Sequence, residues 1–428
     1  MSNLELARTF FLQMAVILLV VRAAGKLAKR LGQPQVIGEM LAGIVLGPSV
    51  FGLLLPDWQA RIFPPPTIGV IYVISQIGLV LFMFLVGVEF RTDLIRSRMR
   101  VAGSVSLAGI LAPFTLGALL AFFLIRQPGI FPEGVPVWGA MLFLGAAMSI
   151  TAFPVLARIL QDRGLSGTSL GTLALGAAAI DDAVAWCLLA VLLASFSGNG
   201  WIALAAIGGG VLYFAAARGL VRPFLQRLGK RVEARGELRV RSLTLVLMMV
   251  MVGAFITDYV GIHAVFGAFI LGTAMPRGAV RSELEQKLAP LVKSFLIPLF
   301  FVYSGLNTQL GLVAFNPAML GLAGVVFLLA CLGKGVACYA AARLSGESNR
   351  EALGIGTLMN ARGLTELIIL NIGLERGVIS PALFTVMVIM ALATTVMTSP
   401  LFDLVYRRTT QLSPAPAVEA VPEFELES

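Results

Sequence analysis

Charge is what this sequence lacks most. Only 13% of its 428 residues are Asp, Glu, Lys or Arg, whereas 58% are hydrophobic. Soluble domains carry about 25% charged residues, and half of that proportion cannot cover the surface of a soluble particle of this size. The composition therefore argues against a soluble enzyme and against a nucleic-acid-binding protein. It predicts that lipid covers most of the molecular surface.

Histidine and cysteine are also scarce, which excludes several kinds of active site. The chain has one histidine, His263, and three cysteines, Cys187, Cys331 and Cys338, scattered through apolar segments. A single histidine cannot build a metal cluster, and an odd, scattered set of cysteines is no disulfide framework. We therefore expect no resident metal centre and no other cofactor.

Long apolar runs fill most of the chain. A membrane-spanning helix needs about 20 mainly apolar residues. Thirteen such runs lie near residues 7–25, 34–54, 67–89, 101–125, 136–160, 168–196, 200–221, 241–259, 262–277, 289–306, 317–343, 350–375 and 381–405. The predicted fold is an all-α polytopic membrane protein with about 13 transmembrane helices.

The distribution of basic residues tests this division into spans. If the N-terminus lies outside, 26 of the 32 Lys and Arg residues fall in inner loops and 4 in outer segments. Cytoplasmic loops carry an excess of Lys and Arg. We therefore expect a protein of the cell inner (plasma) membrane with a cytoplasmic C-terminus. On this interpretation the net charge of +9 records topology and indicates no nucleic-acid partner.

A repeat runs through the spans. Residues 36–43 of the second span resemble residues 265–272 of the ninth, and residues 81–88 of the third resemble residues 299–306 of the tenth. The order is the same, which predicts a duplication of spans 1–6 as spans 8–13. Corresponding helices are seven spans apart, an odd number, so the halves have inverted topology. Inverted repeats are typical of secondary transporters, whose substrate site lies near the membrane midplane.

Charged residues inside the predicted spans are the main candidates for function. Asp181 and Asp182 lie mid-span, Lys334 lies in the eleventh span, and Arg362 and Glu366 lie in the twelfth. A charge at the bilayer centre costs about 2.5–3.5 kcal/mol on insertion scales. A buried structural pair of one Asp with Lys334 is the alternative, but it needs one carboxylate and the chain supplies two. The second carboxylate could face water and bind either a cation or a proton.

Two corresponding spans carry polar interruptions beside these charges. Span five contains Ser149 and Thr151 before Pro154, and span twelve contains Asn360 and Gly363. Proline removes a backbone donor and disfavours a helix at the preceding residue. A proline kink would explain span five alone. Interruptions in both halves instead predict crossed discontinuous helices around a binding site.

Glu39 lies in the glycine-rich second span. Two interpretations are open: it lines the ion path, or it lies where its helix meets water.

Four segments together resemble the monovalent cation:proton antiporter superfamily: residues 35–49, residues 149–157, the Asp181–Asp182 pair and residues 360–367. The nearer branch includes NapA-like Na⁺/H⁺ antiporters, KefC-like potassium efflux proteins and plant cation/H⁺ exchangers. The resemblance covers about residues 5–405. By position, Asp182 matches the aspartate that binds cation and proton, and Asp181 matches the acid that pairs with a lysine, here Lys334.

The resemblance also implies an architecture. We expect a homodimer whose protomers each have a dimer (panel) domain, from spans 1–3 and 8–10, and a core domain, from spans 4–6 and 11–13. Span 7 would be a linker within the membrane domain, residues 1–405. The core would move as an elevator. Residues 406–428 are predicted to be a short disordered cytoplasmic tail.

The favoured function is an electrogenic Na⁺/H⁺ antiporter. The candidate ligands of the monovalent cation are Asp182, Asp181, Thr151 and Ser149, and the candidate compensating charges are Lys334, Arg362 and Glu366. Alternatives are a K⁺/H⁺ antiporter, a K⁺ efflux pathway and a Na⁺-coupled organic anion symporter. An intramembrane aspartyl protease is disfavoured, because consecutive helix residues point about 100° apart.

Overall fold

The chain folds into helices joined by short connections. The computed structural model describes residues 2–89, 99–165, 168–196, 200–260 and 263–407, and none of these residues forms a strand. In chain order the elements are α1 (Asn3–Arg30), α2 (Gln35–Leu46), α3 (Phe51–Leu54), α4 (Pro56–Ile62), α5 (Pro65–Glu89), α7 (Met99–Leu124), α8 (Val137–Ser149), α9 (Phe153–Asp162), α10 (Ser169–Phe196), α11 (Gly200–Ala216), the π-helical η2 (Ala217–Val221), α12 (Arg222–Arg235), α13 (Val240–Val260), α14 (Ala264–Ala274), α15 (Ala279–Leu291), the π-helical η3 (Val292–Leu296), α16 (Ile297–Leu306), α17 (Gly311–Ala314), α18 (Pro317–Leu344), α19 (Asn349–Leu358), α20 (Leu364–Glu375) and α21 (Pro381–Arg407).

These helices match the predicted polytopic architecture. Each of the thirteen apolar runs corresponds to one helix or to two or three consecutive helices. Within the described residues, eight helical stretches are long and apolar enough to cross a membrane. The fifth and twelfth runs are each split into two half-helices, α8 with α9 and α19 with α20. The all-α fold with discontinuous helices is therefore confirmed.

Three features differ in detail from the predicted spans. The tenth span begins at Ala279, ten residues earlier than its apolar run, because the charged helix α15 continues through η3 into α16. In the second span, α2 ends at Leu46, and a break separates it from α3. The basic loop after the seventh span contains α12, which buries Leu225, Leu228 and Val232. The first two residues of the predicted tail, 406 and 407, belong to α21, and the rest of it, from position 408 onward, lies outside the described residues.

Close helix contacts repeat between the two halves. A Cβ on Gly43 of α2 would overlap the main chain of Phe301 on α16, and a Cβ on Gly305 would overlap Gly43 itself. In the other half, a Cβ on Gly272 of α14 would overlap the main chain of α5 at Gly87. The sequence repeat aligns Gly43 with Gly272 and Gly87 with Gly305. The aligned glycines thus make the same contact twice, which is what a structural duplication requires.

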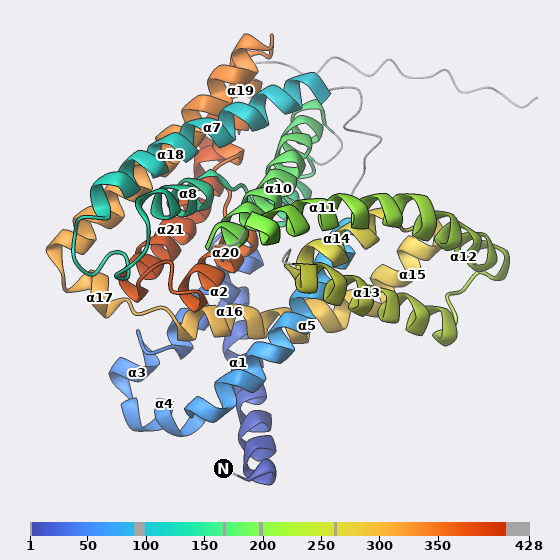
Figure 1. Ribbon diagram of the computed structural model, residues 1–428, viewed down its shortest axis with the longest axis horizontal. Helices are drawn as coiled ribbons and strands as arrows, with labels where there is room; N and C mark the ends of the chain where they lie inside the picture. The colour runs from blue at the N-terminus through green and yellow to red at the C-terminus, as the bar shows by residue number, and fades with distance from the viewer. Residues whose placement is uncertain (1, 90–98, 166–167, 197–199, 261–262, 408–428) are drawn as a thin grey trace, which may run out of the picture.

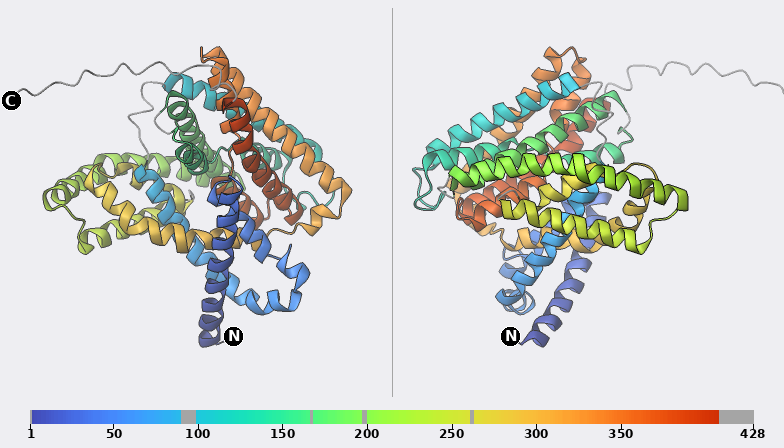
Figure 2. Two further views of the ribbon diagram at one scale, coloured as in Figure 1. Left: turned by 180° about the vertical axis from the view of Figure 1, so that it is seen from behind. Right: turned by 45° about the vertical axis from the view of Figure 1, so that its right-hand side comes forward.

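The helices gather into two groups, visible in Figures 1 and 2. In one, here called the α18 group, helices α7–α10 pack with α18–α21; Figure 1 shows α7 and α18 side by side. In the other, the α5 group, α5 packs on α14 and α2 packs on α16, with α1, α13 and α15 around them. The continuous stretch α11–η2–α12 leads from the first group along α13 (Figure 2).

Candidate functional site

The two broken helices meet inside the α18 group. Residues 150–152 separate α8 from α9, and residues 359–363 separate α19 from α20. The Ala152 N–H donates a hydrogen bond to the Ala361 carbonyl at 3.0 Å, and the Thr151 hydroxyl donates to the Met359 carbonyl at 3.0 Å. These bonds hold the two interruptions against each other. Four helix ends therefore converge on one point, as the paired interruptions in the sequence predicted.

The break in the fifth span comes before its proline. The helix α9 already begins at Phe153, so Pro154 lies in the first turn of α9. Proline is tolerated there because the first N–H groups of a helix have no partner within the helix. Pro154 therefore starts the second half-helix, whereas the sequence had suggested that it disfavours helix at Phe153. In the twelfth span, Gly363 directly precedes α20, and its Cβ position is occupied by the Val155 side chain.

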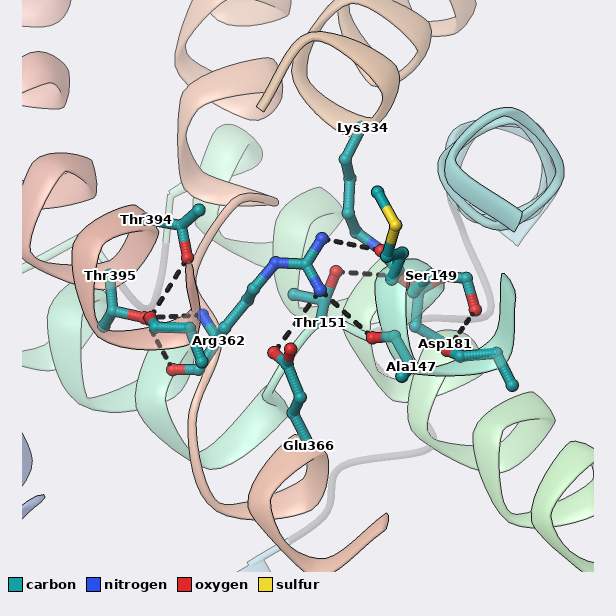
Figure 3. A network of polar contacts seen from close by, with 12 residues as sticks. Ala147, Ser149, Thr151, Asp181, Lys334, Arg362, Glu366, Thr394 and Thr395 are labelled. Carbon is teal, nitrogen blue, oxygen red and sulfur yellow. Dashed lines mark hydrogen bonds and ion pairs between the residues drawn. The ribbon is translucent and has the colours of Figure 1, made fainter. Parts of the chain in front are cut away.

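Asp181 on α10 forms a fully buried ion pair with Lys334 on α18 (Figure 3). The Lys334 Nζ lies 2.8 Å from Asp181 Oδ2, and both side chains are 0% exposed. The Ser106 hydroxyl donates to Asp181 Oδ1 at 2.5 Å, and the Thr151 hydroxyl donates to Asp181 Oδ2 at 2.8 Å. Both carboxylate oxygens are therefore occupied in this conformation.

Lys334 has two further acceptors. It donates to the Gly109 carbonyl on α7 at 3.0 Å and to the Ser149 carbonyl at the end of α8. An ammonium group has three donors, and all three are used. The Lys334 charge thus neutralises Asp181 and caps the C-terminal end of a half-helix, where the partial charge of the helix is negative.

Arg362 occupies the break in the twelfth span and closes the end of α8 (Figure 3). Its guanidinium donates to the Ala147 carbonyl at 3.2 Å and to the Met148 carbonyl at 2.6 Å, and it pairs with Glu366 at 3.3 Å. Thr395 on α21 bonds both the N–H and the carbonyl of Arg362 at 2.9 Å. Arg362 therefore fixes the break to α8 and to α21.

Asp182, the next residue on α10, has different surroundings. It is 3% exposed, and its Oδ1 has no hydrogen-bond partner in the part of the chain that the structure describes. The Thr365 hydroxyl and the main chain of Phe153 lie close enough to its carboxyl group to interact with it. Burial of a carboxylate with an unsatisfied oxygen is costly, so this position favours the uptake of a positive charge.

The hydroxyl groups of the two other predicted ligands point elsewhere in this conformation. The Ser149 hydroxyl donates back to the Ala146 carbonyl of its own helix at 2.8 Å, and Thr151 serves Asp181 and Met359. Asn360 donates to the Gly356 carbonyl at 3.0 Å, and its Oδ1 has no partner among the described residues. Thr151, Asp181 and Lys334 are brought together, and the Ser149 carbonyl joins them in place of its hydroxyl.

A cavity of about 200 Å³ lies between the two helix groups. It is lined by α2, α5, η3 and α16 from the α5 group and by α9 from the α18 group. Its polar residues are Gln35, Glu39, Glu89 and Lys293. Glu39 is buried and accepts a hydrogen bond from Gln35 at 2.9 Å. Phe153 also lines the cavity, so the cavity leads toward the surroundings of Asp182.

Sequence reasoning missed several polar partners. Ser106 bonds Asp181, Thr395 holds Arg362, and Thr365 lies beside Asp182. Hydroxyl groups are common in apolar helices, where they bond their own main chain. Only Thr365 carried a signal, because it lies one turn from the Arg362 break.

The sequence is similar to those of known transporters. A family model described as "Sodium/hydrogen exchanger, transmembrane" matches residues 15–404. The chain is 43% identical over 404 residues to the Na(+)/H(+) antiporter NhaS4 of Synechocystis, covering 94% of this chain and 96% of that protein. It is 37% identical to cation/H(+) antiporter 17 of Arabidopsis thaliana over 92% of this chain but only 48% of the plant protein. It is 32% identical to K(+)/H(+) antiporter 1 of Saccharomyces cerevisiae, again over about half (46%) of that protein and over 93% of this chain.

The fold is similar to that of a solved transporter. The sodium proton antiporter MjNhaP1 from Methanocaldococcus jannaschii superposes with a TM-score of 0.64 at 16% sequence identity. The match covers 95% of this chain and 99% of the other. At this identity the likeness concerns the fold.

Proposed function

Because the chain belongs to the transmembrane sodium/hydrogen exchanger family, we propose that this cation/proton antiporter exchanges Na⁺ for protons at Asp182. The observation that carries the proposal is the contrast between two neighbouring carboxylates. Asp181 has a partner for each oxygen, whereas Asp182 is buried with an oxygen that has no partner in the described part of the chain.

Asp182 binds one positive charge at a time. A buried carboxylate is stabilised either by a proton or by a small cation, because each removes the cost of an unpaired buried charge. Na⁺ is a hard cation and prefers oxygen ligands, as do the other hard cations bound by proteins. The Thr365 hydroxyl and the Thr151 and Ser149 groups at the helix break supply further oxygens. Competition for one carboxylate couples the two ion fluxes.

Lys334 makes the exchange electrogenic. When the cation binds at Asp182, the Asp181–Lys334 pair breaks and Lys334 releases its proton. When the cation leaves, Lys334 regains the proton and the pair in Figure 3 forms again. The two loaded forms then differ by one unit of charge. Arg362 and Glu366 remain paired throughout and balance the charge of the half-helix ends.

The cation reaches Asp182 through the cavity between the helix groups. Glu39 and Glu89 on its wall attract cations, and the basic residue Lys293 lies 3.7 Å from Glu89. By the charge distribution of the loops, this mouth faces the cytoplasm, the N-terminus lies outside, and the protein resides in the plasma membrane. K⁺ is the second candidate cation, because one relative is a K(+)/H(+) antiporter.

The two helix groups correspond to the two parts of an elevator. The α18 group, which carries all the buried charges of the site, is the mobile core. The α5 group is the panel that anchors a homodimer, and α11 links them. Movement of the core past the panel would open Asp182 first to one side of the membrane and then to the other.

Transport by purified protein in liposomes tests the proposal. Addition of NaCl should dissipate an imposed pH gradient in the wild-type protein. The Asp182→Asn variant should be inactive, whereas Asp57→Asn, which neutralises an exposed aspartate on α4, should be normal. Na⁺ should raise the melting temperature of the wild type but not that of Asp182→Asn, which separates loss of binding from loss of folding. Normal exchange by Asp182→Asn would refute the assignment, and a parallel series of chloride salts identifies the cation.

A further inference from the structure

Polar contacts join the two helix groups on the side of the site away from the cavity. The Tyr303 hydroxyl on α16 donates to Glu375 at the end of α20 at 2.9 Å. The Asn371 amide on α20 donates to the Ser304 hydroxyl on α16 at 3.2 Å. Ser304 and Asn371 are buried, whereas Glu375 is exposed. The contacts therefore extend from the interior to the rim. Their position relative to the cavity follows from the direction in which α16 and α20 run.

On the α5-group side, the cavity lining runs along η3 and α16 from Lys293 to Phe301, and Tyr303 and Ser304 follow two and three residues beyond Phe301. On the α18-group side, Thr365 lies beside Asp182, and Glu375 lies ten residues farther along α20. The continuous helix η3–α16 thus lines the cavity at one end and forms the closed interface at the other.

A third contact lies at the closed end. The Gln309 N–H, just after α16, donates to the Thr385 hydroxyl on α21 at 3.1 Å. On the cavity side, an exposed hydrogen bond from Gln33 to the Val396 carbonyl at 3.2 Å also joins the groups. Of these four hydrogen bonds, the buried one, between Asn371 and Ser304, lies at the closed end. Buried hydrogen bonds resist separation more than exposed ones, because breaking them leaves unsatisfied polar groups.

We propose that Tyr303 and Ser304 on α16 are positioning residues that, through Glu375 and Asn371, hold the transporter open toward the cavity mouth. The contacts form a latch that must break in every cycle before Asp182 can face the opposite side. The inference rests on the proposed function, since it needs the α18 group to move past the α5 group. It concerns the balance between the two conformations and leaves the ion site unchanged.

The latch has a one-sided kinetic consequence. If only a fraction f of the protein is in the conformation that binds a ligand, the apparent dissociation constant equals the intrinsic constant divided by f. A weaker latch increases the population that is open opposite the cavity. The apparent KM for Na⁺ presented on that side should therefore fall, whereas the KM on the cavity side should hardly change, because that conformation already predominates.

The experiment measures the Na⁺ KM from each side in vesicles of defined orientation. Tyr303→Phe removes only the hydroxyl and keeps the ring, whose centroid lies 5.1 Å from that of the Tyr72 ring. Ser304→Ala removes the inner contact. Each variant should lower the KM on the side opposite the cavity by about three- to tenfold, the factor for one hydrogen bond. Tyr259→Phe, an exposed tyrosine at the end of α13, should change neither KM and is the matched control.

A second background tests whether Tyr303 acts through Glu375. In a Glu375→Ala protein, which lacks the acceptor, Tyr303→Phe should have no further effect. An unchanged KM on the side opposite the cavity, equal shifts on both sides, or a full Tyr303 effect without Glu375 would each overturn the proposal. Failure of the proposed function gives a different result, exchange that survives Asp182→Asn, so the two failures can be told apart.

Discussion

Two adjacent carboxylates on α10 have opposite surroundings. Asp181 receives hydrogen bonds from Ser106 and Thr151 and an ion pair from Lys334, all at 2.5–2.8 Å. Asp182 points about 100° away on the same helix, where one of its oxygens has no partner among the described residues. One carboxylate is therefore held in place, and the other is available to a transported ion.

Replacement of Lys334 by Gln should have two effects. Removal of one partner of a buried ion pair leaves an uncompensated charge on Asp181, which costs about 3–5 kcal/mol of stability. Without Lys334, the cation-loaded and proton-loaded forms carry the same charge, so the exchange rate should no longer respond to an imposed membrane potential. In the wild type, one charge moved through 100 mV is worth about 2.3 kcal/mol.

The double variant Asp181→Asn with Lys334→Gln is the control for folding. It contains no unpaired charge, so most of the lost stability should return, while the voltage response should stay absent. Melting temperature and exchange rate at set potentials measure the two effects. A wild-type voltage response in the double variant would show that the pair takes no part in charge transfer.

Part of this site could be predicted from residues alone. A charge in an apolar run is rare enough to identify Asp181, Asp182 and Lys334, and their pairing follows from the cost of leaving them unpaired. Ser106 and Thr395 could not be identified, because nothing in their local sequence distinguishes a hydroxyl that bonds a distant residue from one that bonds its own helix. The orientation of the Ser149 hydroxyl depends on backbone geometry in the same way.

At the scale of helices, the site depends on two breaks held together. Arg362 closes the end of α8 by bonding the Ala147 and Met148 carbonyls, while Lys334 bonds the Ser149 carbonyl. The two positively charged side chains at this helix end compensate the negative partial charge of its last carbonyl groups, which have no partner within the helix. The sequence indicated the breaks through Asn360, Gly363 and Pro154. Pro154 lies in the first turn of α9, because a proline can begin a helix as well as end one.

The glycine contacts between α2 and α16 lead to a prediction about stability. Gly43→Ala should lower the free energy of unfolding by about 1–3 kcal/mol, because its Cβ would overlap the Phe301 carbonyl and the backbones must separate. Gly272→Ala should have a similar effect, since it occupies the corresponding position against α5. Thermal unfolding in detergent or lipid nanodiscs measures both.

Gly69→Ala is the matched control within α5. Its Cβ would meet open space, so the substitution should be neutral or stabilise the helix by about 0.5–1 kcal/mol. If Gly43→Ala and Gly69→Ala unfold at the same temperature, the close approach of α2 and α16 does not limit stability.

For the whole molecule, the sequence predicted the spans and the duplication well. The length of apolar runs and the repeated glycine motifs are local signals. In the structure the runs form helices, and the glycines make paired contacts between helices. The cavity, the relation of the two helix groups and the contacts from Tyr303 and Ser304 could not be predicted. They depend on how distant helices pack, which a single sequence does not record.

The most direct test of competition at Asp182 uses the wild-type protein and varies only proton concentration. The apparent KM for Na⁺ is measured at a series of pH values on one side of the membrane. If a proton and the cation compete for Asp182, and cation binding also releases the Lys334 proton, the KM rises by at least about tenfold, and by up to about a hundredfold when both protons are displaced, for each unit of decrease in pH, and the maximal rate at saturating Na⁺ is restored. A KM for Na⁺ that stays constant across that range would contradict binding at a shared site.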